Sequence, residues 1–183
     1  MIFFLANIAL FALVNSRLFD YYFYMNQNLP NIALDIIDRK ILTALQQDGR
    51  LSNVQLAEKV GLSESACLRR VKLLENNGII DRYVMLLDQA AIGRPGTVFV
   101  QVTLEGQQQE KLQRFETEIG KVEDVLECYL MSGDSDYLLK IIVRGNEDYL
   151  RVHNRLTGLP GVLRVQSAFA LKTVIRKTEL PLS

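Results

Sequence analysis

The first group of residues that could do chemistry combines small and polar side chains with three basic ones that follow them in the sequence. Arginine can bind guanine O6 and N7 through two hydrogen bonds, or it can bind a phosphate, and only the first contact reads sequence. Small residues would let a helix approach the groove of DNA closely. Taken alone, the group is more typical of a solvated helix face. It comprises Ser63, Glu64, Ser65, Ala66, Arg69, Arg70 and Lys72.

A second group has the composition of a turn, because Ser, Gly and Asp are common in any hairpin. The same residues could also bind a small ligand. Asp134 or Asp136 could accept hydrogen bonds from a ligand ammonium, and backbone N–H groups near Gly133 could bind its carboxylate. Both ends of an amino acid would then be matched, although composition alone favours a plain turn. The candidate effector residues are Ser132, Gly133, Asp134, Asp136 and Tyr137.

Catalysis has little support in the sequence. There is one histidine, His153, there are two distant cysteines, Cys67 and Cys128, and no glycine-rich phosphate loop is present. No spacing of ligands indicates a metal, and no cofactor is expected. Two cysteines embedded in apolar sequence fit a reducing cytoplasm. The sequence therefore predicts a cytoplasmic protein that is not an enzyme.

Charge and hydropathy set the next constraints. The 183 residues have a formal net charge of zero, so DNA binding would have to come from a local basic patch. Met1–Val14 is almost continuously apolar, but it is shorter than a membrane span, and no Lys or Arg precedes it. We expect residues 1–24 to be an extension outside the domain, with translation starting at Met25. A membrane-anchored form is the alternative.

Three helices are predicted between Leu34 and Gly78. The first has Asp35 as its cap and Gly49 as a left-handed stop; the second has Ser52 and Gln55 as a capping box and ends at Gly61. The third begins at Ser63, stops before Gly78 and buries a stripe of four residues, Cys67, Leu68, Val71 and Leu74. The short helix, tight turn and longer helix form a helix-turn-helix pattern, with Ala57 four residues before Gly61. In that context, we interpret the basic face of the third helix as DNA-reading.

A second domain follows a linker. Ile80–Leu87 is strand-like, and Gly93-Arg94-Pro95-Gly96 makes a joint between units. Beyond it the patterns predict strand, helix, two strands joined by a turn, a helix capped by Asn146, and a closing strand. This βαββαβ order is ferredoxin-like, and the fold class is α+β. A sheet face left free of helices predicts an oligomer.

The expected domains are therefore the extension 1–24, a helix-turn-helix domain 25–79, a strand and linker 80–95, and a ferredoxin-like domain 96–183. The last of these would sense a ligand and assemble subunits. Two symmetric readers for two DNA half-sites require a dimer or a larger even oligomer.

Short motifs along the chain also resemble those of a known family. They are Leu34-Asp-x-x-Asp38-Arg-x-Ile41-Leu42, Asp48-Gly-Arg50, Leu56-Ala57, Val60-Gly61-Leu62-Ser63, Arg70-Val71, Leu74-Glu75, Gly78-Ile79-Ile80, Ser132-Gly133-Asp134-Ser135-Asp136-Tyr137 and Leu159-Pro160-Gly161-Val162. With these motifs the sequence resembles the Lrp/AsnC, or feast/famine, family of regulators. The resemblance runs from about Ile32 to the C-terminus and departs from the family over residues 1–24. It implies a winged-type helix-turn-helix, a ferredoxin-like domain that binds effectors close to the 132–137 turn at subunit interfaces, and dimers that commonly form octamers.

Together these patterns predict a sequence-specific transcriptional regulator that binds double-stranded DNA and responds to an amino acid or a similar metabolite. The alternative is a metabolite-sensing or assembly module that does not read DNA. Such a module would need a recognition face without basic residues, and Arg69, Arg70 and Lys72 argue against it.

Overall fold

The computed structural model describes residues 33–182, which form two compact units. The first unit contains the described residues up to Met85 together with those from Arg176 onward, and the second is Leu86–Ile175. The N-terminal extension and the start at Met25 lie outside the described residues. Among the helices of the described part, none is long and apolar enough to cross a membrane.

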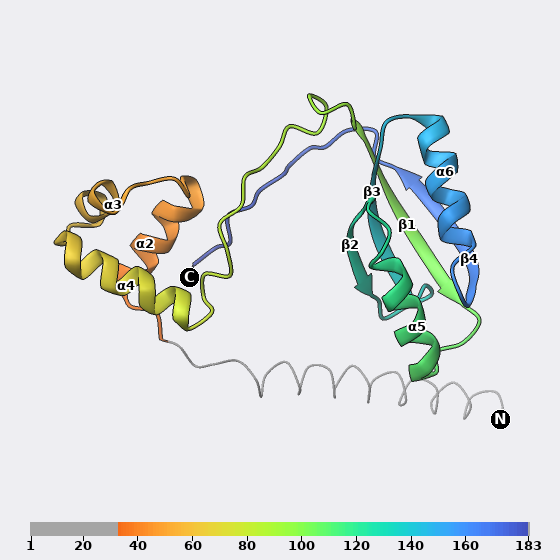
Figure 1. The fold of residues 1–183 in the computed structure, drawn as a ribbon, viewed down its shortest axis with the longest axis horizontal. Helices are drawn as coiled ribbons and strands as arrows, with labels where there is room; N and C mark the ends of the chain where they lie inside the picture. Colours follow the sequence, from red (N-terminus) through yellow and green to blue (C-terminus); the bar gives the residue numbers. More distant parts are fainter. Residues whose placement is uncertain (1–32, 183) are drawn as a thin grey trace, which may run out of the picture. The chain divides into compact units, whose positions relative to one another are not determined.

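The first unit is built from the helices α2 (Ile36–Gln47), α3 (Asn53–Val60) and α4 (Glu64–Asn76) (Figure 1). Their N-terminal caps are Asp35, Ser52 and Ser63, whose side chains each accept a hydrogen bond from a backbone N–H of the first turn. Gly61 ends α3 in the left-handed conformation, with φ 74°. The buried core of this unit consists of Ile41, Leu42, Ala44, Leu56, Ala57, Val60, Cys67 and Leu74.

The end of the chain returns to this unit. The side chain of Gln46 donates to the carbonyl of Leu180 at 3.1 Å and accepts from its N–H at 2.6 Å. Leu182 packs against the helical core. The C-terminal tail therefore completes the first unit, although it follows the last strand of the second.

Two expectations for the helices were wrong. Helix α2 ends at Gln47, its C-cap Asp48 has an extended backbone with φ −144°, and Gly49 is not in the left-handed conformation. Leu68 is 43% exposed, whereas Cys67 is fully buried. Because successive helical residues are rotated by about 100°, Leu68 lies on the outer side of α4 and does not belong to the buried stripe.

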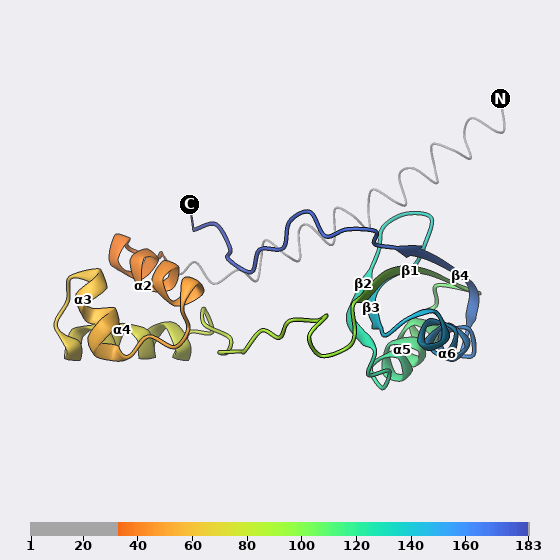
Figure 2. The same ribbon diagram turned by 90° about the horizontal axis from the view of Figure 1, so that it is seen from above.

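The second unit has two layers, with α5 and α6 covering one face of an antiparallel sheet (Figure 2). Its strands follow the order β2-β3-β1-β4 across the sheet. The chain order is βαββαβ, as predicted. The elements are β1 (Gly96–Leu104), α5 (Gln109–Ile119), β2 (Val125–Leu130), β3 (Tyr137–Val143), α6 (Asn146–Thr157) and β4 (Val162–Phe169).

Alternation along β1 divides its side chains between the core and the opposite face of the sheet. Val98, Val100 and Val102 are buried in the core that the helices cover. Phe99 lies between them in sequence and therefore points to the other face, where it is 41% exposed. The register places Lys140 and Ala168 beside Phe99 on the neighbouring strands. This face carries no helix among the described residues.

Two further expectations were wrong in detail. No strand forms at Ile80–Leu87, because this segment has no partner strand within the described chain. Helix α6 has Gly145 as its N-cap, and Asn146 is its first residue. Asp148, three residues after the cap, accepts a hydrogen bond from the N–H of Arg144 at 2.9 Å. The carboxylate therefore holds the chain entering α6.

Candidate nucleic-acid interface

The start of α4 is fixed by contacts with α3. The side-chain amide of Asn53, the first residue of α3, donates to the carbonyl of Glu64 at 2.9 Å. Ser63 accepts from the N–H of Ala66 at 3.3 Å, and its hydroxyl lies 3.4 Å from that of Ser65. Glu64 and Ser65 are exposed. The unit thus holds the first turn of α4 firmly and leaves its outer side open.

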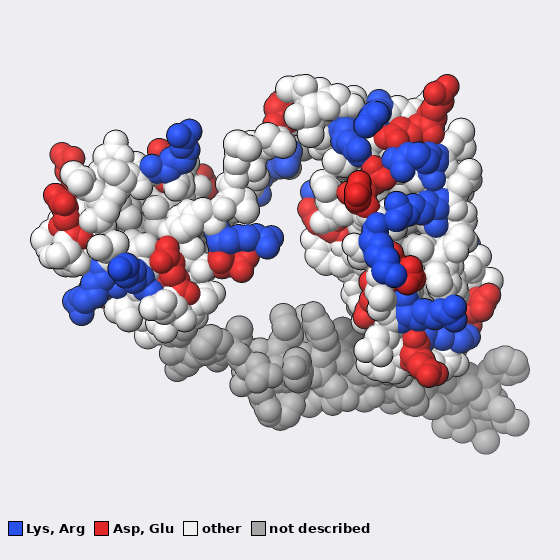
Figure 3. Space-filling view, viewed as in Figure 1, with Lys and Arg blue, Asp and Glu red and all other residues white. Residues whose placement is uncertain are grey.

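One face of α4 presents cations to solvent. Arg69 and Lys72 are exposed, and no hydrogen bond or ion pair of either is found within residues 33–182. Figure 3 shows Lys and Arg side chains gathered over α4, with acidic side chains nearby. A shallow hollow on this face is lined by Ser65, Leu68, Arg69, Lys72, Leu73 and Asn76.

Arg70 has a different environment from Arg69. Its Nη1 donates to Asp35 Oδ2 and to Asp38 Oδ1, both at 2.7 Å. The hydrogen bond from the N–H of Asp38 and the contact with Arg70 both lower the pKa of the Asp35 carboxyl. Arg70 therefore links α4 to the start of α2. The sequence pattern groups it with Arg69 because its partners lie 35 and 32 residues away.

The residues of the candidate effector turn, 132–137, differ in exposure and in hydrogen bonding. Asp136 is 6% exposed, and its carboxylate accepts from the N–H of Leu104 at 2.7 Å and from the side chain of Gln107 at 2.6 Å. Ser132, Gly133 and Asp134 are exposed. Both oxygens of Asp136 thus serve the fold, and Asp134 is the carboxylate that faces solvent.

Tyr137 lies beneath this turn. It is 1% exposed, packs against Phe115 with ring centroids 4.6 Å apart, and donates its hydroxyl to Glu116 at 2.8 Å. Burial, followed by the hydrogen bond to Glu116, raises its pKa above the usual value for tyrosine. It therefore supports the turn from within the core.

His153 and the cysteines form no cluster. His153 Nδ1 lies 3.3 Å from the hydroxyl of Tyr149 on the same helix. Burial raises the pKa of the Cys67 thiol, which lies in the helical core. No group of three His, Cys, Asp or Glu residues suited to a metal occurs in the described part of the chain.

Both units match known family models. Residues 34–81 match a winged helix-turn-helix DNA-binding model, and residues 97–180 match the model of the Lrp/AsnC ligand binding domain. Among curated proteins, the chain is 45% identical over 150 residues to the Bkd operon transcriptional regulator of Pseudomonas aeruginosa, covering 81% of this chain and 98% of that protein. It is 40% identical over 152 residues to the leucine-responsive regulatory protein of Escherichia coli K12, covering 82% and 93%.

Solved structures give the same picture. An AsnC family transcriptional regulator from Agrobacterium tumefaciens aligns with a TM-score of 0.78 at 40% identity, covering 81% of this chain and 97% of that one. A transcriptional regulator from Neisseria meningitidis, solved as a complex with L-Met, aligns with a TM-score of 0.78 at 37% identity, with the same coverage.

Proposed function

The chain belongs to the Lrp/AsnC family, and from this we propose that it is a DNA-binding transcriptional regulator whose DNA binding responds to an amino acid. The observation that carries the proposal is the outer face of α4, where Arg69 and Lys72 are exposed beside the small residues Ser65 and Ala66. A helix-turn-helix inserts the start of its second helix into the major groove, where such side chains reach base edges and phosphates.

The residues of α4 that are predicted to bind DNA have unequal roles. Arg69 and Lys72 contact DNA, while Ser63 and Glu64 set the position of the first turn. Arg70 supports the domain through Asp35 and Asp38 and contributes to DNA binding indirectly. The three cations of α4 therefore do not form one continuous DNA-binding face.

Selection of bound fragments from genomic DNA tests this part directly. The unaltered protein should enrich a defined sequence, and Arg69→Ala should lose that enrichment. Arg114→Ala is the matched control, because Arg114 is an exposed arginine on α5 in the other unit. Equal enrichment by the Arg69→Ala and Arg114→Ala proteins would contradict the assignment of α4 as the reading helix.

The proposed amino-acid site is the turn 132–137, and the relative solved as a complex with L-Met supports it. We place an amino acid there, with its ammonium near Asp134 and its carboxylate near the N–H groups around Gly133, whose φ is 155°. Calorimetric titration with the twenty amino acids should identify a ligand, and Asp134→Ala should weaken its binding. Glu123→Ala is the control, since Glu123 is an exposed carboxylate of the same unit.

The proposal also includes the assembly of copies of this chain. The sheet face that carries Phe99, Leu138 and Ile142 is not covered by α5 or α6, and its apolar side chains favour pairing with a second copy. A dimer would also supply two reading helices for two half-sites. Octamers follow from the family resemblance alone.

A further inference from the structure

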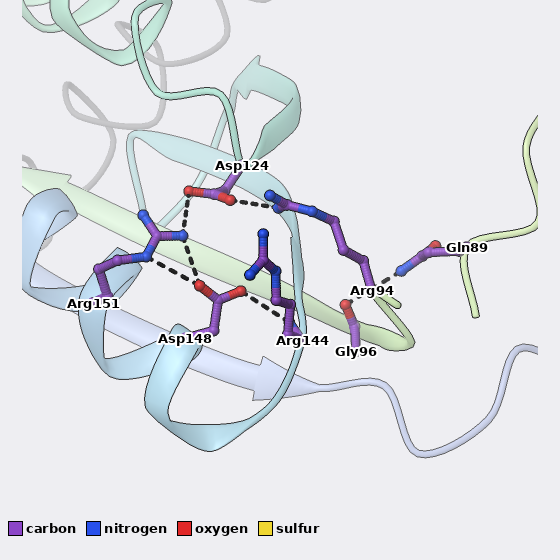
Figure 4. Close-up of polar contacts among 7 residues, drawn as sticks. All are labelled: Gln89, Arg94, Gly96, Asp124, Arg144, Asp148 and Arg151. Atoms are coloured by element: carbon purple, nitrogen blue, oxygen red, sulfur yellow. Dashed lines mark hydrogen bonds and ion pairs between the residues drawn. The ribbon is translucent and has the colours of Figure 1, made fainter. Parts of the chain in front are cut away.

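A buried carboxylate in the second unit joins two segments that are distant in sequence. Asp124, just before β2, is 3% exposed. Its Oδ1 accepts from Arg94 at 2.6 Å and its Oδ2 from Arg151 at 2.9 Å (Figure 4). Burial would raise the pKa of this carboxyl, but the hydrogen bonds from the two guanidinium groups outweigh it and hold the pKa below its ordinary value. Asp124 is therefore charged, and each of its two carboxylate oxygens accepts a hydrogen bond from one arginine.

Arg94 belongs to a structured elbow at the end of the linker, residues 88–96. Within it, the N–H of Ala91 donates to Asp88 at 2.7 Å, and the N–H of Arg94 donates to the carbonyl of Gln89 at 2.9 Å. The side chain of Gln89 donates to Thr97 Oγ1 at 3.0 Å, which fixes the elbow to β1. The elbow is thus part of the second unit.

The close approach of the elbow to the sheet depends on Gly96. A Cβ at this position would lie 2.7 Å from Cγ2 of Val143 on the neighbouring strand. Upstream, residues 81–87 are exposed and form no helix or strand. The hydrogen-bonded part of the linker is therefore the elbow itself, which belongs to the second unit.

Arg151 brings α6 into the same cluster. Its Nε and Nη2 donate to Asp148 Oδ1 at 3.0 and 2.7 Å, and Nη2 also reaches Asp124. Asp148 in turn accepts a hydrogen bond from the N–H of Arg144, which lies just before α6. Figure 4 shows these side chains converging between α6 and the end of the linker. A continuous chain of charged contacts thus runs from α6 through Asp124 to Arg94.

We propose that Asp124 is a positioning residue that couples α6 of the sensing domain to the linker elbow, and so to the DNA-reading helices that the linker carries. The regulatory meaning of this coupling rests on the proposed amino-acid response. A displacement of α6 changes the geometry at Arg151, and the shared carboxylate of Asp124 passes that change to Arg94 and the elbow. Such transmission requires that the ligand favour one arrangement of α6 over another.

Amide hydrogen exchange on the full chain, without DNA or amino acid, tests the coupling separately from the proposed function. Arg151→Ala removes the contact on α6 and leaves Arg94 intact. The amides of Ala91, Gly93 and Arg94, which are hydrogen-bonded within the elbow, should exchange about two- to fivefold faster. Amides of β1 and β3 should keep their rates, which separates coupling from general destabilisation.

Arg155→Ala is the matched control, because Arg155 lies one turn further along α6 and donates to the carbonyl of Lys121 instead of to Asp124. The elbow should exchange at the parental rate in this variant. Arg94→Ala should speed exchange of the elbow directly, and adding Arg151→Ala to it should have no further effect. Unchanged elbow exchange in Arg151→Ala, or an equal increase in Arg155→Ala, would overturn the coupling, whether or not an amino acid binds.

Discussion

Replacing Asp136 by alanine should destabilise the second unit, although the residue lies in a turn. The side chain accepts the N–H of Leu104 at 2.7 Å in a buried hydrogen bond and the side chain of Gln107 at 2.6 Å. Gln107 is exposed and can turn to water, whereas the N–H of Leu104 would remain buried without an acceptor. Leaving one buried donor unsatisfied costs about 1–3 kcal/mol. For a domain of roughly 60–100 residues this lowers Tm by about 5–20 °C.

Differential scanning calorimetry of the full chain measures this effect. Asp134→Ala is the control in the same turn; its exposed side chain should change Tm by less than about 2 °C. Asp136→Asn keeps an oxygen for the N–H of Leu104 and should fall between the two. If Asp136→Ala melts with the parent, the carboxylate is not needed for the fold, and its loss becomes a valid test of ligand binding. Otherwise only Asp134 can supply that test.

Four further outcomes can be measured on the same protein. Arg69→Ala should weaken specific DNA binding by about 1–3 kcal/mol without changing Tm. Arg70→Ala should lower the Tm of the helical unit because it releases Asp35 and Asp38; equal melting of both variants would contradict the division of roles. The pKa of Asp124 in the folded protein is lower than its reference value of 3.8, so its charged carboxylate stabilises the fold above that pH. This stability is lost as the pH falls through the native pKa. Thermal scans below about pH 4 should therefore show a steeper loss of Tm for the parent than for Asp124→Asn. Light scattering at micromolar concentration should give an even oligomer, and Phe99→Lys should shift it toward monomer, whereas a monomeric parent would refute the sheet-face assembly.

Local signals made the elements predictable. Ser52 with Gln55, and Ser63, mark helix starts within one turn of sequence, and the alternation of valines marks β1. The strand expected at Ile80–Leu87 failed for the complementary reason. Its residue types favour a strand, but strand formation needs a partner, which the local sequence does not reveal.

The roles of individual charges were harder to predict, because they depend on partners far along the chain. Arg69 and Arg70 are adjacent and chemically identical, yet only Arg70 meets carboxylates of α2. Asp134 and Asp136 are two residues apart, yet only Asp136 points at the buried end of β1. Charge and spacing therefore identify the two candidate surfaces, and the tertiary contacts show which of their side chains are held by the fold.

The position of Asp124 adds a constraint on how any response could reach DNA. Arg94 is anchored to the second unit by this carboxylate, and the segment from 81 to 87 makes no regular structure. In the proposed coupling, a displacement of Arg151 reaches the elbow through the carboxylate of Asp124. An effector can shift DNA affinity through this route only by as much as it discriminates between arrangements of α6. Coupling between sites is reciprocal, so if the elbow, α6 and the proposed ligand site are coupled, releasing the elbow must alter ligand affinity. Calorimetric titration of Arg94→Ala with the amino acid that binds the parent should therefore give a changed affinity, and an unchanged affinity would contradict the coupling.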